Sequence, residues 1–198
     1  MPSDRFSRVL ARIDQLNSED PNTELVEGRP VPRELAYAQR VTAWVLRLRP
    51  AASEALRIAA RGQHVQRWTI PRDRYERNRR GYLRWRETLK AFHADTVAAA
   101  MREAGYREEE MAPVRRIMGK RELSQDPESQ TLEDALCLVF LETQFADLRA
   151  KEPDDKMIEI LRKTWQKMST AGRAEALKLP LDKGERRLLE QALSAGGS

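Results

Sequence analysis

The sequence predicts an all-α protein folded as a single-domain helical bundle. Apolar residues recur three and four positions apart along most of the chain, which is the spacing of one helix face. Val and Ile form no alternating runs, and Gly is scarce, with 9 in 198 residues. Hydrophobic residues make up 40% of the chain and charged residues 34%, a balance typical of amphipathic helices around one core.

Helical spacing predicts three helices in the first third of the chain, over residues 3–17, 32–48 and 51–65. Two prolines and a glycine make residues 18–31 a loop, and the proline that opens the second helix suits a first helical turn. The third helix is rich in Ala, and Gly62 near its end permits another element to approach closely.

The middle of the chain predicts a loop and two further helices. Residues 66–79 contain Pro71 and few apolar side chains, so we expect them to form the loop. An apolar stripe then predicts a long helix over residues 80–104, which ends before a glycine. Residues 107–119 are expected to form the next helix, whose first turn carries three glutamates that suit the positive end of the helix dipole.

The most apolar run of the chain, LEDALCLVFLETQF, predicts the most buried helix of the protein. This helix is expected over residues 128–151, after a loop over residues 120–127. Two amphipathic helices are predicted beyond it, over residues 154–170 and 183–194.

Composition also limits the class of protein. We expect one domain over residues 1–175, followed by a C-terminal helix and a disordered tail over residues 176–198. No apolar stretch approaches a membrane span of about 18 residues, and the first residues lack the apolar core of a signal peptide. The one cysteine, Cys137, is expected as a buried thiol in a reducing compartment. These features favour a cytoplasmic protein without a membrane partner, either a monomer or a homodimer.

A strongly basic segment spans residues 61–93. It holds both histidines of the chain and ten Arg or Lys residues against three acidic ones, whereas the whole chain carries a formal charge of only +5. A guanidinium is a planar fork of donors that matches phosphate or carboxylate, and aromatic rings offer stacking faces. The residues expected to bind an anion are Arg61, Arg67, Trp68, Arg72, Tyr75, Tyr82, Arg86, Lys90 and Lys120. The alternative is a solvated helix face whose aromatic residues lie in the core.

A second candidate group consists of His64, His93, Glu133 and Asp134. Two imidazoles and two carboxylates from three helices can ligate a divalent ion such as Mn, Fe or Zn, which would polarise a phosphoryl group and generate hydroxide. Buried carboxylates need partners, and Glu133 and Asp134 stand at the entrance to the most apolar run. The alternative is that both imidazoles are hydrogen-bonded within the arginine network, with the two carboxylates as its counterions.

Four stretches of the chain resemble an uncharacterised bacterial and fungal family that is described only as a domain of unknown function. They are RELAYAQRVTAWV, IAARGQHVQRWTIPR, GYLRWRETLKAFHAD and QTLEDALCLVFLE, and the resemblance covers about residues 5–170. The order of features also resembles the HD superfamily of helical, metal-dependent phosphohydrolases. This second resemblance implies an HD-domain-like order of helices.

The HD resemblance also implies particular site residues. The stretch DPESQTLEDALCL is similar to the element that carries the final metal-binding aspartate, which corresponds to Asp134. In AARGQHV, Gln63 and His64 stand where His and Asp are expected, and Tyr37 stands at the first His position. The resemblance therefore implies a divergent site. Either His64, His93 and Asp134 bind a divalent metal (Mn, Fe, Zn or Mg), or Arg and Lys side chains replace its charge.

The leading hypothesis for function is a hydrolase that acts on a small phosphorylated or anionic metabolite or nucleotide, with metal or arginine assistance. His64 and His93 would be ligands or general acid–base groups, and Glu133 and Asp134 would bind metal or orient water. One alternative is a non-catalytic module that binds a nucleotide or another anionic metabolite. A second alternative is an RNA-binding protein that uses the basic and aromatic residues of 61–93, although nucleic acid is the lesser expectation.

Overall fold

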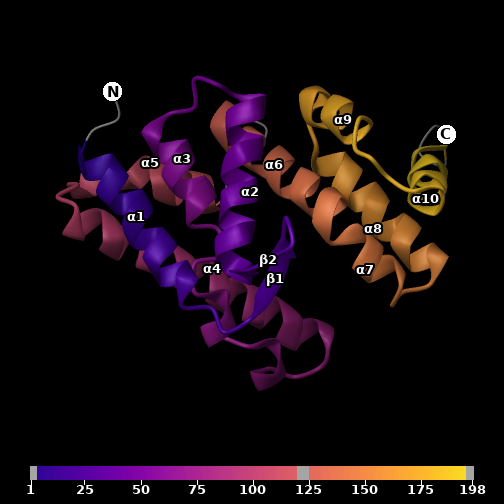
Figure 1. Ribbon diagram of the computed structural model, residues 1–198, viewed down its shortest axis with the longest axis horizontal. Helices are drawn as coiled ribbons and strands as arrows, with labels where there is room; N and C mark the ends of the chain where they lie inside the picture. Colours follow the sequence, from indigo (N-terminus) through magenta and orange to yellow (C-terminus); the bar gives the residue numbers. More distant parts are fainter. Residues whose placement is uncertain (1–3, 120–124, 195–198) are drawn as a thin grey trace.

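The computed structural model describes residues 4–119 and 125–194, which are almost entirely helical (Figure 1). The prediction of an all-α, single-domain bundle is confirmed. Lys120 and the expected disordered tail at 195–198 lie outside the described residues. In chain order, the elements are α1 (Asp4–Ser18), β1 (Thr23–Val26), β2 (Arg29–Pro32), α2 (Arg33–Leu48), α3 (Glu54–Arg61), two 3-10 turns (Arg67–Thr69 and Arg72–Arg74), α4 (Arg79–Glu103), α5 (Glu108–Gly119), α6 (Pro127–Thr143), α7 (Phe145–Arg149), α8 (Asp154–Lys167), α9 (Thr170–Ala176) and α10 (Lys183–Ser194).

Helix α6 lies at the centre of the bundle, as its apolar sequence predicts. It packs most extensively on α2 and also contacts α3, α5, α7, α8 and α9. Figure 1 shows α1, α3 and α5 on one side of the α2–α6 pair and α8, α9 and α10 on the other. Buried residues point in every direction around α6, because a helix enclosed by its neighbours has no solvated face.

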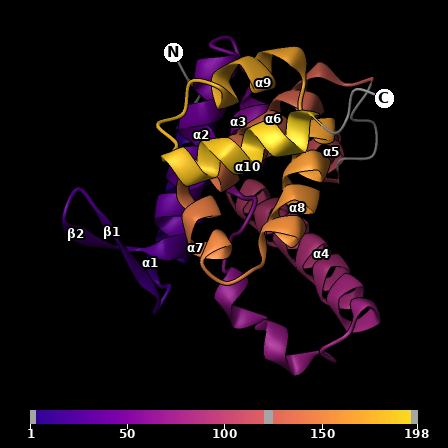
Figure 2. The same ribbon diagram turned by 90° about the vertical axis from the view of Figure 1, so that its right-hand side faces the viewer.

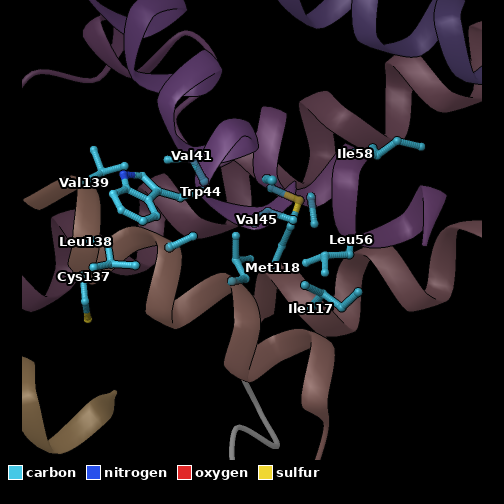
Figure 3. Packing of buried hydrophobic residues seen from close by; sticks show 14 of the residues in the cluster. Val41, Trp44, Val45, Leu56, Ile58, Ile117, Met118, Cys137, Leu138 and Val139 are labelled. Atoms are coloured by element: carbon cyan, nitrogen blue, oxygen red, sulfur yellow. The ribbon is translucent and has the colours of Figure 1, made fainter. Parts of the chain in front are cut away.

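The main core joins α2, α3, α5 and α6 (Figure 3). Val41 and Val45 of α2, Leu56 of α3, Ile117 of α5 and Leu138 of α6 are all fully buried in it. Burial of each such side chain contributes about 1.5–3 kcal/mol relative to exposure. This packing fixes α6 against α2 and α3, the helices that carry or precede the candidate site residues.

Several helix ends differ from those expected. Helix α3 ends at Arg61, short of the predicted end, and turns follow it. The predicted helix over residues 128–151 is divided between α6 and α7, because Gln144 has φ −120° and ψ −15°. Helix α8 ends before Met168, whose ψ is 139°, and Ser169 then caps the short helix α9.

The expected loop over residues 18–31 contains an antiparallel hairpin, β1–β2, in which Val26 pairs with Arg29. Glu27 and Gly28 have positive φ angles of 49° and 76°, the geometry of a tight two-residue hairpin turn. Because each strand has an open edge, prolines are tolerated in this ribbon. Figure 2 shows the hairpin projecting from the bundle.

The close approach expected at Gly62 is confirmed, and α4 is the element that makes it. A Cβ atom built on Gly62 would lie 2.2 Å from Cγ2 of Val97. Because α4 passes so near the end of α3, His93 of α4 comes beside His64, with 6.0 Å between the two ring centroids. The glycine therefore helps to assemble the candidate site.

Helix α10 packs against α8 and lies across it in Figure 2. Leu188 and Leu189 are buried, and Arg187 forms an ion pair of 2.8 Å with Asp154 at the start of α8. The division into residues 1–175 and 176–198 stays a prediction. None of the helices described here is long and apolar enough to cross a membrane.

Candidate functional site

A cavity of about 530 Å³ opens among α2, the turn after α3, α4, α5, α6 and α8. Its charged lining consists of Arg67, Arg86, Glu87, Lys90, Glu133 and Lys167. Among the described residues of the lining, the cations exceed the carboxylates by two, so this part of the wall carries a net positive charge. Much of the remaining wall is apolar or aromatic, and such a wall strengthens the field of the charges because it keeps the local dielectric low.

His93 of α4 lies in this wall and is only 5% exposed. Its Nδ1 lies 2.9 Å from the carbonyl oxygen of Val65, so Nδ1 carries the proton and donates it. Its Nε2 is buried and has no hydrogen-bond partner within the described residues. Burial, with smaller contributions from His64 and Arg67, lowers the pKa of His93 to about 3. The ring is therefore neutral at pH 7, with a buried and unpaired acceptor at Nε2.

His64 lies beside His93 and is held by contacts with three other side chains. Its Nε2 is 3.0 Å from Nη1 of Arg67, and its Nδ1 is 3.3 Å from Oε2 of Glu34. A guanidinium can only donate, so Nε2 of His64 accepts and Nδ1 carries the proton toward Glu34. The ring also stacks on Tyr37, with centroids 4.0 Å apart and planes 5° apart. These contacts hold His64 in one tautomer and one orientation.

Glu34 supports the site although the sequence analysis did not select it. It stands in the first turn of α2, where an acidic residue is ordinarily explained by the helix dipole. The side chain is 8% exposed, and its backbone N–H donates to Oδ2 of Asp20 at 3.0 Å. Burial, more than any other cause, raises the pKa of Glu34 to about 7. Only the position beside His64 distinguishes this glutamate from others at helix starts.

Arg67 is held in place before any ligand arrives. Its guanidinium lies 5.0 Å from the ring centre of Trp85, and the indole Nε1 of Trp85 donates to the carbonyl of Ile70 at 2.9 Å. Gln66, just before Arg67, has a left-handed φ of 52° and donates its backbone N–H to Oδ1 of Asn17 at 3.1 Å. The turn at Gln66 and the indole ring of Trp85 together hold the guanidinium of Arg67, with its planar set of donors, in the wall of the cavity.

The two carboxylates of α6 diverge. Glu133 lines the cavity, and its Oε1 lies 3.8 Å from Nζ of Lys167. Asp134 is absent from the lining, and its Oδ1 accepts from the backbone N–H of Ser169 at 2.7 Å and from Gln130 at 3.0 Å. The hydroxyl of Ser169 also donates to Asp134. Asp134 therefore anchors the turn between α8 and α9, on a different face of α6 from Glu133.

The residues expected to bind an anion are divided in the same way. The structure brings Arg67, Tyr82, Arg86 and Lys90 to the cavity. It places Arg61 beside Asp14 instead, with 3.0 Å between Nε and Oδ1. Of the lining residues, Arg67 comes from the turn after α3, and Tyr82, Arg86 and Lys90 come from the first half of α4. Both parts belong to the basic segment 61–93.

Other expected members lie outside the cavity lining. Arg72 donates to the backbone carbonyls of Tyr75 at 2.9 Å and Glu76 at 2.7 Å, so it stabilises the loop before α4. Trp68 and Tyr75 are also absent from the lining. Conversely, Lys167 of α8 was not expected, because a lysine at the end of an amphipathic helix gives no sequence signal of a site.

The donor atoms do not fit the divalent metal that the HD resemblance implies. In the described parts of the chain, no three His, Cys, Asp or Glu side chains gather in a way that could hold a metal ion. Nε2 of His64 already faces the Arg67 guanidinium, and Asp134 faces Ser169. The guanidinium of Arg67 beside this ring nitrogen repels a metal cation that would need the same nitrogen as a ligand.

The fold and the cavity define a class: a helical protein with a basic pocket whose wall carries two imidazoles held by hydrogen bonds. The chain belongs to the family described as domain of unknown function DUF4202, whose family model matches residues 7–189. That match supports the resemblance to an uncharacterised family. Neither a curated protein nor a solved structure matches the chain.

Proposed function

We propose that the chain binds a small phosphorylated or otherwise anionic metabolite, such as a nucleotide, in this cavity. The observation that carries the proposal is the convergence of Arg67, Arg86, Lys90 and Lys167 around the buried acceptor of His93. Pockets for small ligands combine apolar walls with polar groups that fix orientation, and residues of both kinds line this cavity.

Arg67 is the best-placed anion ligand in the set. Its fork is held by His64 on one side and by the face of Trp85 on another, so little side-chain entropy is lost when an oxyanion binds. Arg86 and Lys90 are exposed and line the opening, where they would attract an anion and close on it. The group most suited to this arrangement is a phosphoryl group, which accepts several hydrogen bonds at once.

His93 adds selectivity to the proposed ligand. A neutral imidazole with an unpaired Nε2 can accept a hydrogen bond, so a ligand that reaches this buried atom should present a hydroxyl or N–H group beside its anionic group. A buried acceptor that stays unpaired costs about 1–3 kcal/mol, and a ligand with such a donor would relieve that cost. A nucleotide or a sugar phosphate carries both groups.

An arginine-assisted hydrolase acting on the same class of ligand is the second candidate. The observation that favours it is that Glu133 shares the cavity with the cations, because a carboxylate can orient a water molecule toward a phosphoryl group held by guanidinium and ammonium groups. The resemblance to HD phosphohydrolases supports the same class of reaction. His93 is a weak base at a pKa of about 3, so its part is to accept a hydrogen bond from the ligand.

Thermal melting tests the binding proposal directly. The protein is melted with nucleoside mono-, di- and triphosphates and with sugar phosphates, each beside its dephosphorylated counterpart. A rise in melting temperature with a phosphorylated compound, lost in Lys90→Gln and kept in Lys183→Gln, supports the proposal. Lys90 and Lys183 are both exposed lysines, but only Lys90 lines the cavity. The absence of any shift across the panel would overturn it.

Phosphate release distinguishes the two candidates. The compounds that raise the melting temperature are incubated with the protein in the presence and absence of a chelator. Turnover that survives the chelator and is lost in Glu133→Gln supports the arginine-assisted hydrolase. Binding without phosphate release supports the binding module instead.

A further inference from the structure

Outside the cavity, the first turns of α4 and the loop before them form an unusually charged surface. Five arginines there are exposed and make no ion pair within the described residues: Arg74, Arg77, Arg79, Arg80 and Arg84. Exposed arginines elsewhere commonly find carboxylates, as Arg102 and Arg107 do with residues of α5. An uncompensated group of cations raises the local positive potential and attracts polyanions.

The nearby acids do not neutralise this surface. Glu76 accepts a hydrogen bond from the side chain of Asn78 at 2.9 Å, and Asn78 in turn caps α4 by accepting from the backbone N–H of Gly81 at 2.8 Å. Glu87 lies further along α4 and lines the first cavity. The loop holds two carboxylates, Asp73 and Glu76, so the five arginines of this surface still outnumber the acids beside them.

A second hollow lies beside these arginines. Its lining carries four cations and two carboxylates beside Asn78 and Tyr82: Arg72, Arg77, Arg79 and Lys156 against Asp73 and Glu152. Tyr82 is 42% exposed and lines both this hollow and the first cavity, so the two are neighbours. Figure 2 shows the loop before α4 and the start of α4 extending beyond the rest of the bundle, where a long ligand could lie along them.

We propose that this surface, which we call the α4 arginine surface, binds single-stranded nucleic acid. Arg74, Arg77 and Arg79 hold backbone phosphates, and the ring of Tyr82 stacks on a base. The exposed ring decides between a nucleic acid and an acidic protein, since every base offers a face for stacking and an acidic peptide gains nothing comparable. Arg86 lies 5.9 Å from the centre of the same ring, which adds charge beside the stacking face.

This inference does not depend on the proposed function, because its arginines lie outside the lining of the first cavity. Failure of the metabolite panel leaves it standing, and its own failure leaves the pocket proposal standing. The two share only Tyr82, Arg86 and the adjoining start of α4.

Fluorescence anisotropy with labelled single-stranded RNA and DNA tests the inference. Wild-type protein should bind an oligonucleotide of either sugar, with log K falling linearly against log salt by about 0.7 per phosphate contacted. The triple variant Arg74→Glu, Arg77→Glu, Arg79→Glu should lose at least tenfold in affinity, and its salt slope should fall by about 2. Because these side chains are exposed and make no ion pairs in the described chain, the variant should keep the wild-type circular dichroism spectrum.

A matched control changes the same charge elsewhere. The control variant reverses three charges at exposed positions on the hairpin and α10: Arg29→Glu, Lys183→Glu and Arg186→Glu. It should leave the salt slope unchanged.

The stacking ring is tested separately. Tyr82→Ala should weaken binding about fivefold or more, and Tyr82→Phe should bind like wild type because the ring remains. Equal losses in both triple variants, or equally tight binding of a labelled polyglutamate peptide, would overturn the proposal.

Discussion

Nδ1 of His93 donates a hydrogen bond to the carbonyl oxygen of Val65 at 2.9 Å, and this single contact fixes both the tautomer and the direction of the ring. The proton is committed to the backbone, so the lone pair of Nε2 stays buried and without a hydrogen-bond partner within the described residues. Burial keeps the ring neutral at physiological pH. The account of the pocket depends on this arrangement, and it has consequences for stability as well as for binding.

Acidification should destabilise the protein through His93. The pKa of the ring is about 3 in the folded protein against a usual 6.5, so the unfolded chain binds the proton first as the pH falls. Between about pH 6 and pH 4, this group should lower the free energy of unfolding by about 1.4 kcal/mol per pH unit. Denaturant titrations of wild type and His93→Asn, which keeps a donor near Val65 and cannot titrate, should differ by that slope. Parallel curves would contradict the buried, neutral ring.

Glu34 should have the opposite pH dependence. Its pKa is about 7 in the folded protein against a usual 4.5, so the folded protein keeps the proton to higher pH than the unfolded chain does. The free energy of unfolding should therefore fall as the pH rises from about 5 to 7, by up to about 1.4 kcal/mol per unit. Glu34→Gln removes this fall, and the difference between variant and wild type measures it.

These two dependences partly cancel in the wild-type protein. Between pH 4.5 and 6.5, one group gains stability with rising pH while the other loses it. Single variants separate them, because each difference curve contains one titration. A Glu34→Gln curve that stays parallel to wild type across this range would mean that the carboxyl is solvated and does not hold His64.

Replacing Asp134 should reduce stability without affecting the ligand. Asp134→Ala leaves the backbone N–H of Ser169 and the amide of Gln130 without their acceptor, at a cost of about 1–3 kcal/mol. The matched change at the preceding residue is Glu133→Gln. It removes a negative charge from the cavity lining and should tighten binding of a phosphorylated ligand. Loss of ligand affinity in folded Asp134→Ala would restore the metal-ligand role implied by the HD resemblance.

The approach of α4 to α3 should be sensitive to one methyl group. Gly62→Ala would place a Cβ 2.2 Å from Cγ2 of Val97, and the resulting strain should cost about 1–3 kcal/mol in the free energy of unfolding. Val97→Ala removes the opposing methyl groups, so the double variant should lose less stability than the two single variants together. Additive losses would show that the two residues do not meet.

Much of the fold was predictable because local signals and tertiary packing agree. Helices α1 and α10 begin and end within a residue or so of the expected ranges, since their apolar spacing is regular. The division between α6 and α7 at Gln144 was not predictable, because neither Gly nor Pro marks it and the neighbouring Phe145 is fully buried by tertiary packing. The β1–β2 hairpin was missed because its strands are short and contain prolines.

The candidate site was predictable only where one segment supplied its residues. Arg67 and Lys90 meet in the cavity as the basic segment suggested. Glu34 and Lys167 come from helices far apart in sequence, and only packing brings them to the site. Adjacency in sequence predicts one site for Glu133 and Asp134, yet consecutive positions on a helix point about 100° apart.

Isothermal titration calorimetry tests the central claim most directly. A phosphometabolite that raises the melting temperature is titrated into wild type and into Arg67→Lys, beside its dephosphorylated counterpart. The account predicts at least tenfold tighter binding of the phosphorylated compound to wild type, and loss of most of that preference when Lys replaces the Arg67 fork. Equal affinity for the two compounds, or an unchanged preference in Arg67→Lys, would contradict it.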